Sequence, residues 1–186
     1  MSHLLAGVFV GGAATRMGGA PKGLLRMSGG ETLVDRWRAL LEARGAEVVL
    51  VGSGDAYRSV GLEVVQDEPS GVGPLGGLVG LLHRAASTPA VAVACDMPFV
   101  RPALLGRLLD APAATVVAPR REGRWEPLFA RYDSPAVLPV ARAHVAAGRH
   151  ALHDLLYALG AVELELSPDE AAQLRDWDSP ADVTGS

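Results

Sequence analysis

Short apolar runs alternate with longer segments of helical periodicity along most of the chain. The apolar runs predict strands at Leu4–Val10, Glu47–Val51, Leu62–Gln66, Ala90–Ala94, Thr115–Ala118, Pro127–Tyr132 and Val162–Leu166. The helical pattern predicts helices at Leu33–Arg44, Leu75–Ala86, Pro102–Leu109, Ser134–Ala147 and Leu152–Leu159. Strands that are apolar throughout are buried on both faces, so this alternation predicts a mostly parallel sheet covered by helices on each side. The predicted class is α/β, with a three-layer, Rossmann-like arrangement.

Turn and cap residues mark several of the predicted boundaries. Gly45 ends the first predicted helix, and a polar turn around Glu122-Gly123 precedes the strand at Pro127–Tyr132. The run Ser167-Pro168-Asp169-Glu170 predicts a helix start, because serine caps, proline occupies the first turn and Glu170 completes a capping box.

The length of the chain fits one ordinary domain, which we expect to span residues 1–186. Hydrophobic residues make up 49% of the sequence and charged residues 20%, which is enough to bury a sizeable core. The net charge of −4 argues against nucleic-acid binding through a broad basic surface. A polyanionic substrate must therefore be met by local donors and a metal ion.

The sequence shows no feature that predicts export or membrane insertion. No basic segment precedes the short apolar run at the start, and no run approaches the roughly 18 apolar residues of a membrane span. Cys95 is the single cysteine, which excludes an intramolecular disulfide and a four-cysteine metal site. We therefore expect a soluble cytoplasmic protein in which Cys95 is a packing residue.

A glycine-rich loop follows the first predicted strand and reads Gly11-Gly12-Ala13-Ala14-Thr15-Arg16-Met17-Gly18-Gly19-Ala20-Pro21-Lys22. Small residues let backbone N–H groups surround a phosphate, and Arg16 and Lys22 supply positive charge. The loop is no Walker P-loop, because Lys22 is followed by Gly23, and the spacing Gly-x-Gly-x-x-Gly is absent too. The pattern favours a phosphate-binding loop over a merely solvated surface loop.

Carboxylates follow two further predicted strands, at the edge where open α/β sheets bind ligands. Asp96 comes directly after an apolar strand, and Mg²⁺ takes such hard oxygen ligands together with substrate phosphates. The alternative is that Asp96 caps the next helix or turn. Asp67 follows the third strand, and the glycine-rich loop Gly71–Gly77 leads into a helix whose N-terminus can approach a base, a ribose or a phosphate.

Weaker signals come from polar residues in the second half of the chain. Asp176 and Asp178 are each either a second metal ligand or a helix cap. Arginines 120, 121 and 124 flank a turn and are either solvated or in contact with the phosphate of an acceptor. The histidines show no metal-ligand or triad spacing, and no Gly-x-Ser-x-Gly motif indicates a serine hydrolase.

Taken together, several motifs resemble one known family. Val8-Phe9-Val10-Gly11-Gly12, followed by Thr15-Arg16-Met17-Gly18 and Lys22, resembles the signature of nucleotidyltransferases with the nucleotide-diphospho-sugar transferase fold. Within that group the chain is similar to the molybdenum cofactor guanylyltransferases, which make the guanine dinucleotide form of molybdopterin from GTP. The similarity continues, in order, through Asp67, Gly73-Pro74-Leu75-Gly76-Gly77, Cys95-Asp96-Met97-Pro98, Glu126-Pro127-Leu128 and Asp178-Ser179-Pro180-Ala181-Asp182.

The resemblance implies a role for each matching position. The implied nucleotide-binding residues are Phe9, Val10, Gly11, Gly12, Arg16, Lys22, Val51, Asp67, Gly76 and Asp96. Arg16, Lys22 and Asp96 would be the catalytic residues among them. Asp96 would hold Mg²⁺, with Asp178 as a second metal ligand.

Details of the motifs favour GTP over CTP and also depart from the family pattern. Val10-Gly11-Gly12 stands where cytidylyl-transferring relatives usually carry Ala-Ala-Gly, and Gly-Pro-Leu-Gly-Gly is similar to the guanylyl branch. Ala20-Pro21 precedes Lys22 where an aspartate is usual, and Val51 or Gly52 replaces a polar residue. The usual Asn-x-Asn-Thr-Pro becomes Asp176-Trp177-Asp178-Ser179-Pro180.

The resemblance thus implies a Mg²⁺-dependent transfer of GMP from GTP to the phosphate of molybdopterin, with release of pyrophosphate. The implied partners are GTP, molybdopterin and proteins that mature molybdoenzymes, with no nucleic acid and no membrane. Three alternatives stay open. The chain is a cytidylyl- or sugar-phosphate nucleotidyltransferase of the same fold, a nucleotide-binding protein without catalysis, or a phosphate-binding hydrolase.

Overall fold

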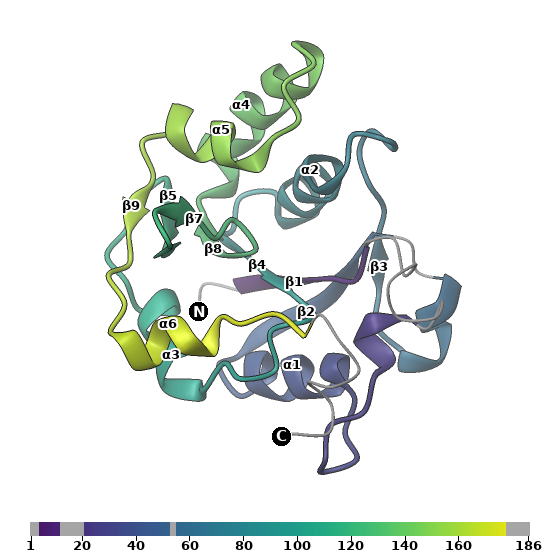
Figure 1. Ribbon diagram of the computed structural model, residues 1–186. Helices are drawn as coiled ribbons and strands as arrows, with labels where there is room; N and C mark the ends of the chain where they lie inside the picture. Colours follow the sequence, from purple (N-terminus) through teal and green to yellow (C-terminus); the bar gives the residue numbers. More distant parts are fainter. Residues whose placement is uncertain (1–3, 12–20, 53–54, 178–186) are drawn as a thin grey trace.

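The computed structural model describes residues 4–11, 21–52 and 55–177. Within them, a seven-stranded sheet has the order β3-β2-β1-β4-β8-β5-β9 (Figure 1). Its strands are β1 (Leu4–Phe9), β2 (Ala46–Val51), β3 (Val64–Val65), β4 (Ala90–Ala94), β5 (Val116–Ala118), β8 (Phe129–Tyr132) and β9 (Val162–Glu163). A separate pair of short strands consists of β6 (Arg120–Arg121) and β7 (Arg124–Trp125).

Parallel pairing at the centre of the sheet sets the position of the candidate site. Strand β1 pairs in parallel with both β2 and β4, and β2 pairs in parallel with β3. In this register Phe9 lies beside Val51 on one side and Ala94 on the other. The carboxyl ends of three strands, which come from distant parts of the sequence, therefore lie side by side at one edge.

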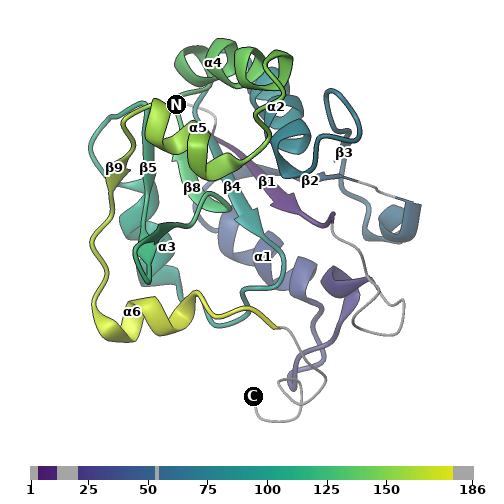
Figure 2. The same cartoon turned by 45° about the horizontal axis from the view of Figure 1, so that its top comes forward.

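Helices cover both faces of the sheet, as predicted for this α/β fold. Figure 1 shows α2, α4 and α5 on one face and α1, α3 and α6 on the other. Figure 2 shows the same division after rotation. The bounds are α1 Leu33–Glu42, α2 Pro74–Ala85, α3 Pro102–Leu109, α4 Ser134–Ala146, α5 Leu152–Ala158 and α6 Pro168–Gln173. Two short 3-10 helices, η2 (Lys22–Leu24) and η3 (Asp55–Val60), lie in connecting segments.

The core is divided by the sheet into two apolar layers. One layer joins α2, α4 and α5 to one face of the strands, and the other joins α1 and α3 to the opposite face. Trp37 of α1 is only 1% exposed, and Leu78 of α2 is completely buried. Strands β1 and β4 are buried on both sides, which explains why their sequences are apolar throughout.

Local side chains account for several helix boundaries. The backbone N–H of Asp35 donates to the Thr32 hydroxyl, and the Asp35 carboxylate accepts from the Thr32 N–H at the start of α1. The predicted capping box at Ser167 and Glu170 is confirmed at the start of α6. Gly45 adopts a φ of +74° just after α1, the left-handed conformation that glycine tolerates best.

Several predicted elements differ from the observed ones. Strand β8 begins at Phe129 instead of Pro127, because the Phe129 N–H closes a turn onto the Glu126 carbonyl. It runs antiparallel to both β4 and β5, which makes the sheet mixed. The strands predicted at Leu62–Gln66 and Val162–Leu166 are limited to two residues each, β3 and β9, at the two ends of the sheet order.

Glycines allow α2 to pack directly against the segment that follows β3. A Cβ added at Gly80 would lie 2.3 Å from the carbonyl oxygen of Gln66 and 3.1 Å from Cγ1 of Val65. A Cβ at Gly76 would lie 2.5 Å from the carbonyl oxygen of Pro69. The closest neighbour at each position is a backbone carbonyl oxygen, so a larger residue requires the helix to shift away from this segment.

We expect Gly80→Ala to lower the free energy of unfolding by about 2 kcal/mol, because the added methyl group collides with backbone. Gly106→Ala in α3 is the matched control, since its Cβ would meet Arg44 only at an ordinary 3.4 Å. Alanine propagates a helix better than glycine, so this control gains roughly 0.5 kcal/mol. Urea unfolding measures both values, and equal effects would contradict the packing described above.

Candidate functional site

Backbone hydrogen bonds join the three central strands where they end. The N–H of Val10 donates to the Val51 carbonyl at 3.1 Å, and the N–H of Cys95 donates to the Phe9 carbonyl at 3.1 Å. The chain leaves β1 through Gly11 at this point, and a Cβ added at Gly52 would lie 3.2 Å from the Gly11 backbone. The first described residue of the predicted phosphate loop is thus fixed against the end of β2.

Lys22 and Asp96 meet at this edge. The Lys22 Nζ donates to Asp96 Oδ2 at 3.0 Å, although 74 residues separate the two positions. Their side chains are 25% and 22% exposed, so the ion pair is partly shielded from water. Lys22 is also the only lysine in the sequence, beside sixteen arginines. The structure therefore brings together the two described members of the predicted catalytic set, and their binding roles stay predictions.

A side chain of α1 binds the backbone of the loop that carries Asp96. Arg36 donates from Nε to the Pro98 carbonyl and from Nη2 to the Val100 carbonyl, both at 2.8 Å. At the end of β4, two residues before Asp96, the Ala94 N–H donates to the Leu128 carbonyl at 2.7 Å. Asp96 therefore lies between a strand end bound to Leu128 and a loop bound by Arg36 of α1.

The C-terminal segment of residues 173–177 returns to the same loop. The Trp177 N–H donates to the Asp96 carbonyl at 2.8 Å, and the Trp177 side chain is completely buried. The Arg101 N–H donates to the Gln173 side chain at 3.0 Å. The Arg175 guanidinium lies 4.9 Å from the centre of the Phe99 ring. Three alternate residues of this segment thus contact the segment that follows β4.

The hairpin of β6 and β7 extends this edge beyond β5. Arg121 donates from Nε to Glu126 at 2.6 Å, and its Nη2 lies 3.5 Å from a carboxylate oxygen of Asp176. Arg120 lies 4.1 Å from the centre of the Trp125 ring. Arg120 and Arg121 are therefore engaged in contacts within the protein and are not simply solvated. Asp176 lies beyond the end of α6, in contact with Arg121.

The predicted nucleotide-contacting residues Phe9, Val51, Asp67 and Gly76 gather around the start of α2. A Cβ added at the neighbouring Gly77 would lie 2.8 Å from a Val51 methyl, 3.0 Å from the Phe9 ring and 3.3 Å from an Asp67 carboxylate oxygen. Burial raises the pKa of the Asp67 carboxyl above its usual range. The Val51 carbonyl accepts from the Val10 N–H, so the sheet itself uses this main-chain acceptor.

Burial also determines the state of Cys95. Burial, together with the charge of the neighbouring Asp96 carboxylate, raises the pKa of the Cys95 thiol to about 12. The thiol is 5% exposed and stays protonated at neutral pH, which fits a packing role and not that of a nucleophile.

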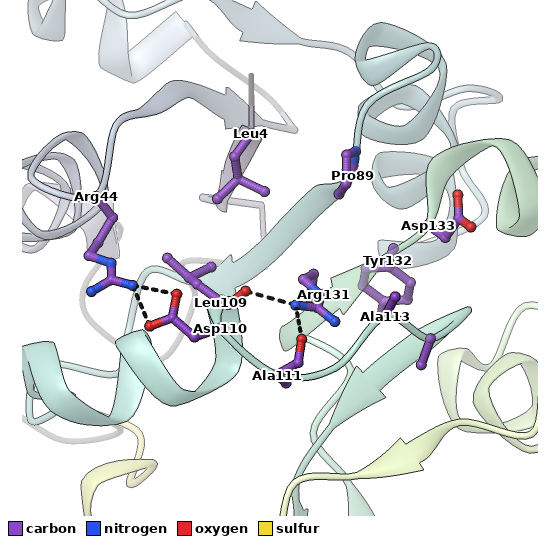
Figure 3. Close-up of a pocket in the computed structure, with 11 residues that line it drawn as sticks. Leu4, Arg44, Pro89, Leu109, Asp110, Ala111, Ala113, Arg131, Tyr132 and Asp133 are labelled. Carbon is purple, nitrogen blue, oxygen red and sulfur yellow. Dashed lines mark hydrogen bonds and ion pairs between the residues drawn. The ribbon is translucent and has the colours of Figure 1, made fainter. Parts of the chain in front are cut away.

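A pocket of about 420 Å³ lies at the opposite edge of the sheet (Figure 3). Leu4 and Pro89, from the starts of β1 and β4, line it together with the Arg44–Asp110 ion pair. Figure 3 shows the Arg131 guanidinium directed at the Leu109 and Ala111 carbonyls, to which it donates at 2.7 Å. No described residue of the predicted site lines this pocket, and the edge with Lys22 and Asp96 is the better candidate for phosphate chemistry.

The donors at the Asp96 edge fit a magnesium ion that is shared with a substrate. Mg²⁺ binds through one or two carboxylates and completes its coordination with water and phosphate oxygens. Asp96 offers such a carboxylate beside the Lys22 ammonium group, which suits a triphosphate. Among the described residues, no group of three or more histidine, cysteine, aspartate or glutamate side chains forms a separate metal cage.

Three predicted positions, Gly12, Arg16 and Asp178, lie outside the described residues. The structure adds two residues to the site, Arg36 and Tyr57, which form hydrogen bonds with its backbone groups. Motif spacing did not indicate them, because contacts with backbone leave no sequence motif. None of the helices in the described part of the chain has the length and apolar character needed to cross a bilayer.

Solved structures show which fold this is. A molybdopterin-guanine dinucleotide biosynthesis protein A from Archaeoglobus fulgidus superposes with a TM-score of 0.77 at 22% identity, covering 96% of this chain and 94% of that chain. A 2-C-methyl-D-erythritol 4-phosphate cytidylyltransferase from Thermus thermophilus superposes with a TM-score of 0.67 at 20% identity, covering 99% and 96%. The predicted nucleotide-diphospho-sugar transferase fold is confirmed.

Sequence comparison defines the family within that fold. Residues 6–162 match the MobA-like NTP transferase domain. A molybdenum cofactor guanylyltransferase of Xanthomonas euvesicatoria is 34% identical over 176 residues, 93% of this chain and 88% of the relative. Another, from Pseudomonas putida, is 33% identical over 183 residues, 96% of this chain and 94% of the relative. The chain belongs to the MobA-like NTP transferase family.

We expect Arg36→Met to lower the free energy of unfolding by about 2 kcal/mol, because two carbonyls of the Asp96 loop lose a charged donor. Arg38→Met is the control on the same helix. Its exposed ion pair with Glu42 contributes less than about 0.5 kcal/mol. Urea unfolding distinguishes the two variants, and a loss below 0.5 kcal/mol for Arg36→Met would show that the loop does not depend on this anchor.

Proposed function

We propose that the protein transfers GMP from GTP to the phosphate of molybdopterin, giving the guanine dinucleotide cofactor and pyrophosphate, with Mg²⁺ as cofactor. One observation carries the proposal: the ion pair of Lys22 and Asp96 lies where the glycine-rich loop leaves β1. The family of the chain and the names of its relatives agree with this chemistry. The proposed location is the cytoplasm.

The reaction requires no nucleophile from the protein. An oxygen of the acceptor phosphate, already anionic at neutral pH, forms a bond to the α-phosphorus of GTP. The bond from that phosphorus to the bridging oxygen breaks, and pyrophosphate leaves with the electron pair. Catalysis then consists of alignment and of stabilising the negative charge that moves onto the leaving group.

Lys22 and Asp96 supply the two charges that this step needs. The two side chains form an ion pair at 3.0 Å. Lys22 would bind the phosphates of the leaving group, and Asp96 would hold Mg²⁺, which would supply Lewis-acid neutralisation of phosphate oxygens. Arg16, from the same loop as Lys22, adds a further positive charge.

Asp67 is the residue that favours guanine. Its carboxylate lies at the glycine-lined start of α2, beside Phe9 and Val51. Guanine presents two adjacent donors, N1–H and the exocyclic amino group, which a carboxylate accepts together. Burial raises the pKa of Asp67 because its carboxylate loses hydration. Donors from guanine would replace that hydration and stabilise the charged form.

We expect Asp96→Asn to lower turnover on the order of 100-fold or more, because the neutral amide binds Mg²⁺ poorly. Asp110→Asn is the matched control, since this aspartate lies in the Arg44 ion pair at the opposite edge of the sheet. Pyrophosphate release with GTP, Mg²⁺ and molybdopterin measures both. Normal turnover by Asp96→Asn would remove the metal assignment.

The identity of the base forms a separate prediction. With molybdopterin present, we expect pyrophosphate release to be at least about tenfold faster with GTP than with CTP, ATP or UTP, a difference of roughly 1.4 kcal/mol in the barrier. A preference for CTP would instead identify a cytidylyltransferase. Nucleotide binding without pyrophosphate release would identify a non-catalytic binding protein, and phosphate release without acceptor would identify a hydrolase.

A further inference from the structure

Tyr57 packs against the turn that carries Lys22. It belongs to η3, which follows the end of β2, and its side chain is 3% exposed. The Gly23 N–H donates to its hydroxyl oxygen at 3.2 Å. Tyr57 also belongs to the buried cluster that contains Cys95, the residue directly after β4. One side chain from beyond β2 therefore connects the lysine turn to this core layer.

The turn around Gly23 is closely packed onto this ring. A Cβ added at Gly23 would lie 2.9 Å from the Tyr57 ring, 3.1 Å from its hydroxyl oxygen and 2.7 Å from a Val34 methyl. Gly23 is itself buried, so water cannot easily replace the phenol as the acceptor for its N–H. The position of the backbone at Lys22 and Gly23 is consequently set by Tyr57.

We propose that Tyr57 is a positioning residue, which fixes the Gly23 backbone and thereby holds the Lys22 ammonium beside Asp96, ready for the phosphates of a nucleotide. The ready position for phosphates rests on the proposed function. The position of Lys22 beside Asp96 does not, because it is seen in the structure itself.

The simpler explanation is that Tyr57 only fills space in the core layer that it shares with Cys95 and Val34. Tyr57→Phe separates the two explanations, because it keeps the ring and removes only the acceptor of the Gly23 N–H. Tyr132→Phe is the matched control. It removes another buried hydroxyl, which donates to the Pro127 carbonyl at 2.6 Å, from a strand end at the opposite edge of the sheet.

The unique lysine makes the first test direct. Because Lys22 is the only lysine, acetylation by an N-hydroxysuccinimide ester, followed by peptide mass spectrometry, reports this one side chain and separates it from the α-amino group. We expect Tyr57→Phe to acetylate Lys22 about fivefold faster than the wild type, since the lysine leaves its shielded ion pair more often. Tyr132→Phe should match the wild type. Equal rates in all three proteins would overturn the proposal.

A double-mutant cycle then asks whether Tyr57 acts through Lys22. Calorimetric titration with GTP and Mg²⁺ should show binding about fivefold weaker for Tyr57→Phe in the wild-type background, and less than about 1.5-fold weaker in a Lys22→Gln background. Equal losses in both backgrounds would contradict a positioning role. If the wild type binds no GTP, the proposed function fails, and the acetylation rates alone decide the role of Tyr57.

Discussion

Burial of β1 between two parallel neighbours is the constraint on which the rest of the structure depends. All of β1 pairs with β2, and Leu5–Phe9 pair with β4, so the three strands end together at Phe9, Val51 and Ala94. Each following segment must therefore start from the same edge. Gly11, the Tyr57 segment and the Asp96 loop thereby start from neighbouring strand ends, although they are widely separated along the chain.

The contact between Lys22 and Asp96 allows two charged side chains to be partly buried at this edge. An unpaired ion there would lose hydration without compensation, and pairing removes most of that cost. The two charges are also held by separate anchors, Tyr57 beneath the lysine turn and Arg36 beneath the aspartate loop. Under the proposed function, a metal and a phosphate group would exchange partners with groups that are already in position, which would keep reorganisation small.

The sequence predicted most strongly what depends on local pattern. Continuous apolar runs located β1 and β4, since strands buried on both faces need such runs, and Asp96 followed from its place after one of them. The reversed direction of β8 was not predictable, because pairing partners and not local sequence set the direction of a strand. Tyr57 and Arg36 were missed because each contacts backbone groups, which leave no motif. The binding and catalytic roles of all the named site residues stay predictions, and Gly12, Arg16 and Asp178 also lie outside the described residues.

The return of residues 173–177 to the Asp96 loop has a consequence for the order in which the protein matures. A ribosome releases the strands of the central sheet long before Gln173, Arg175 and Trp177 emerge. The backbone carbonyl of Asp96 gains its Trp177 partner only after residue 177 has been synthesised. A nascent chain that stalls between Tyr132 and Gln173 therefore carries the lysine turn and the aspartate loop but lacks the contacts that residues 173–177 make with the segment after β4.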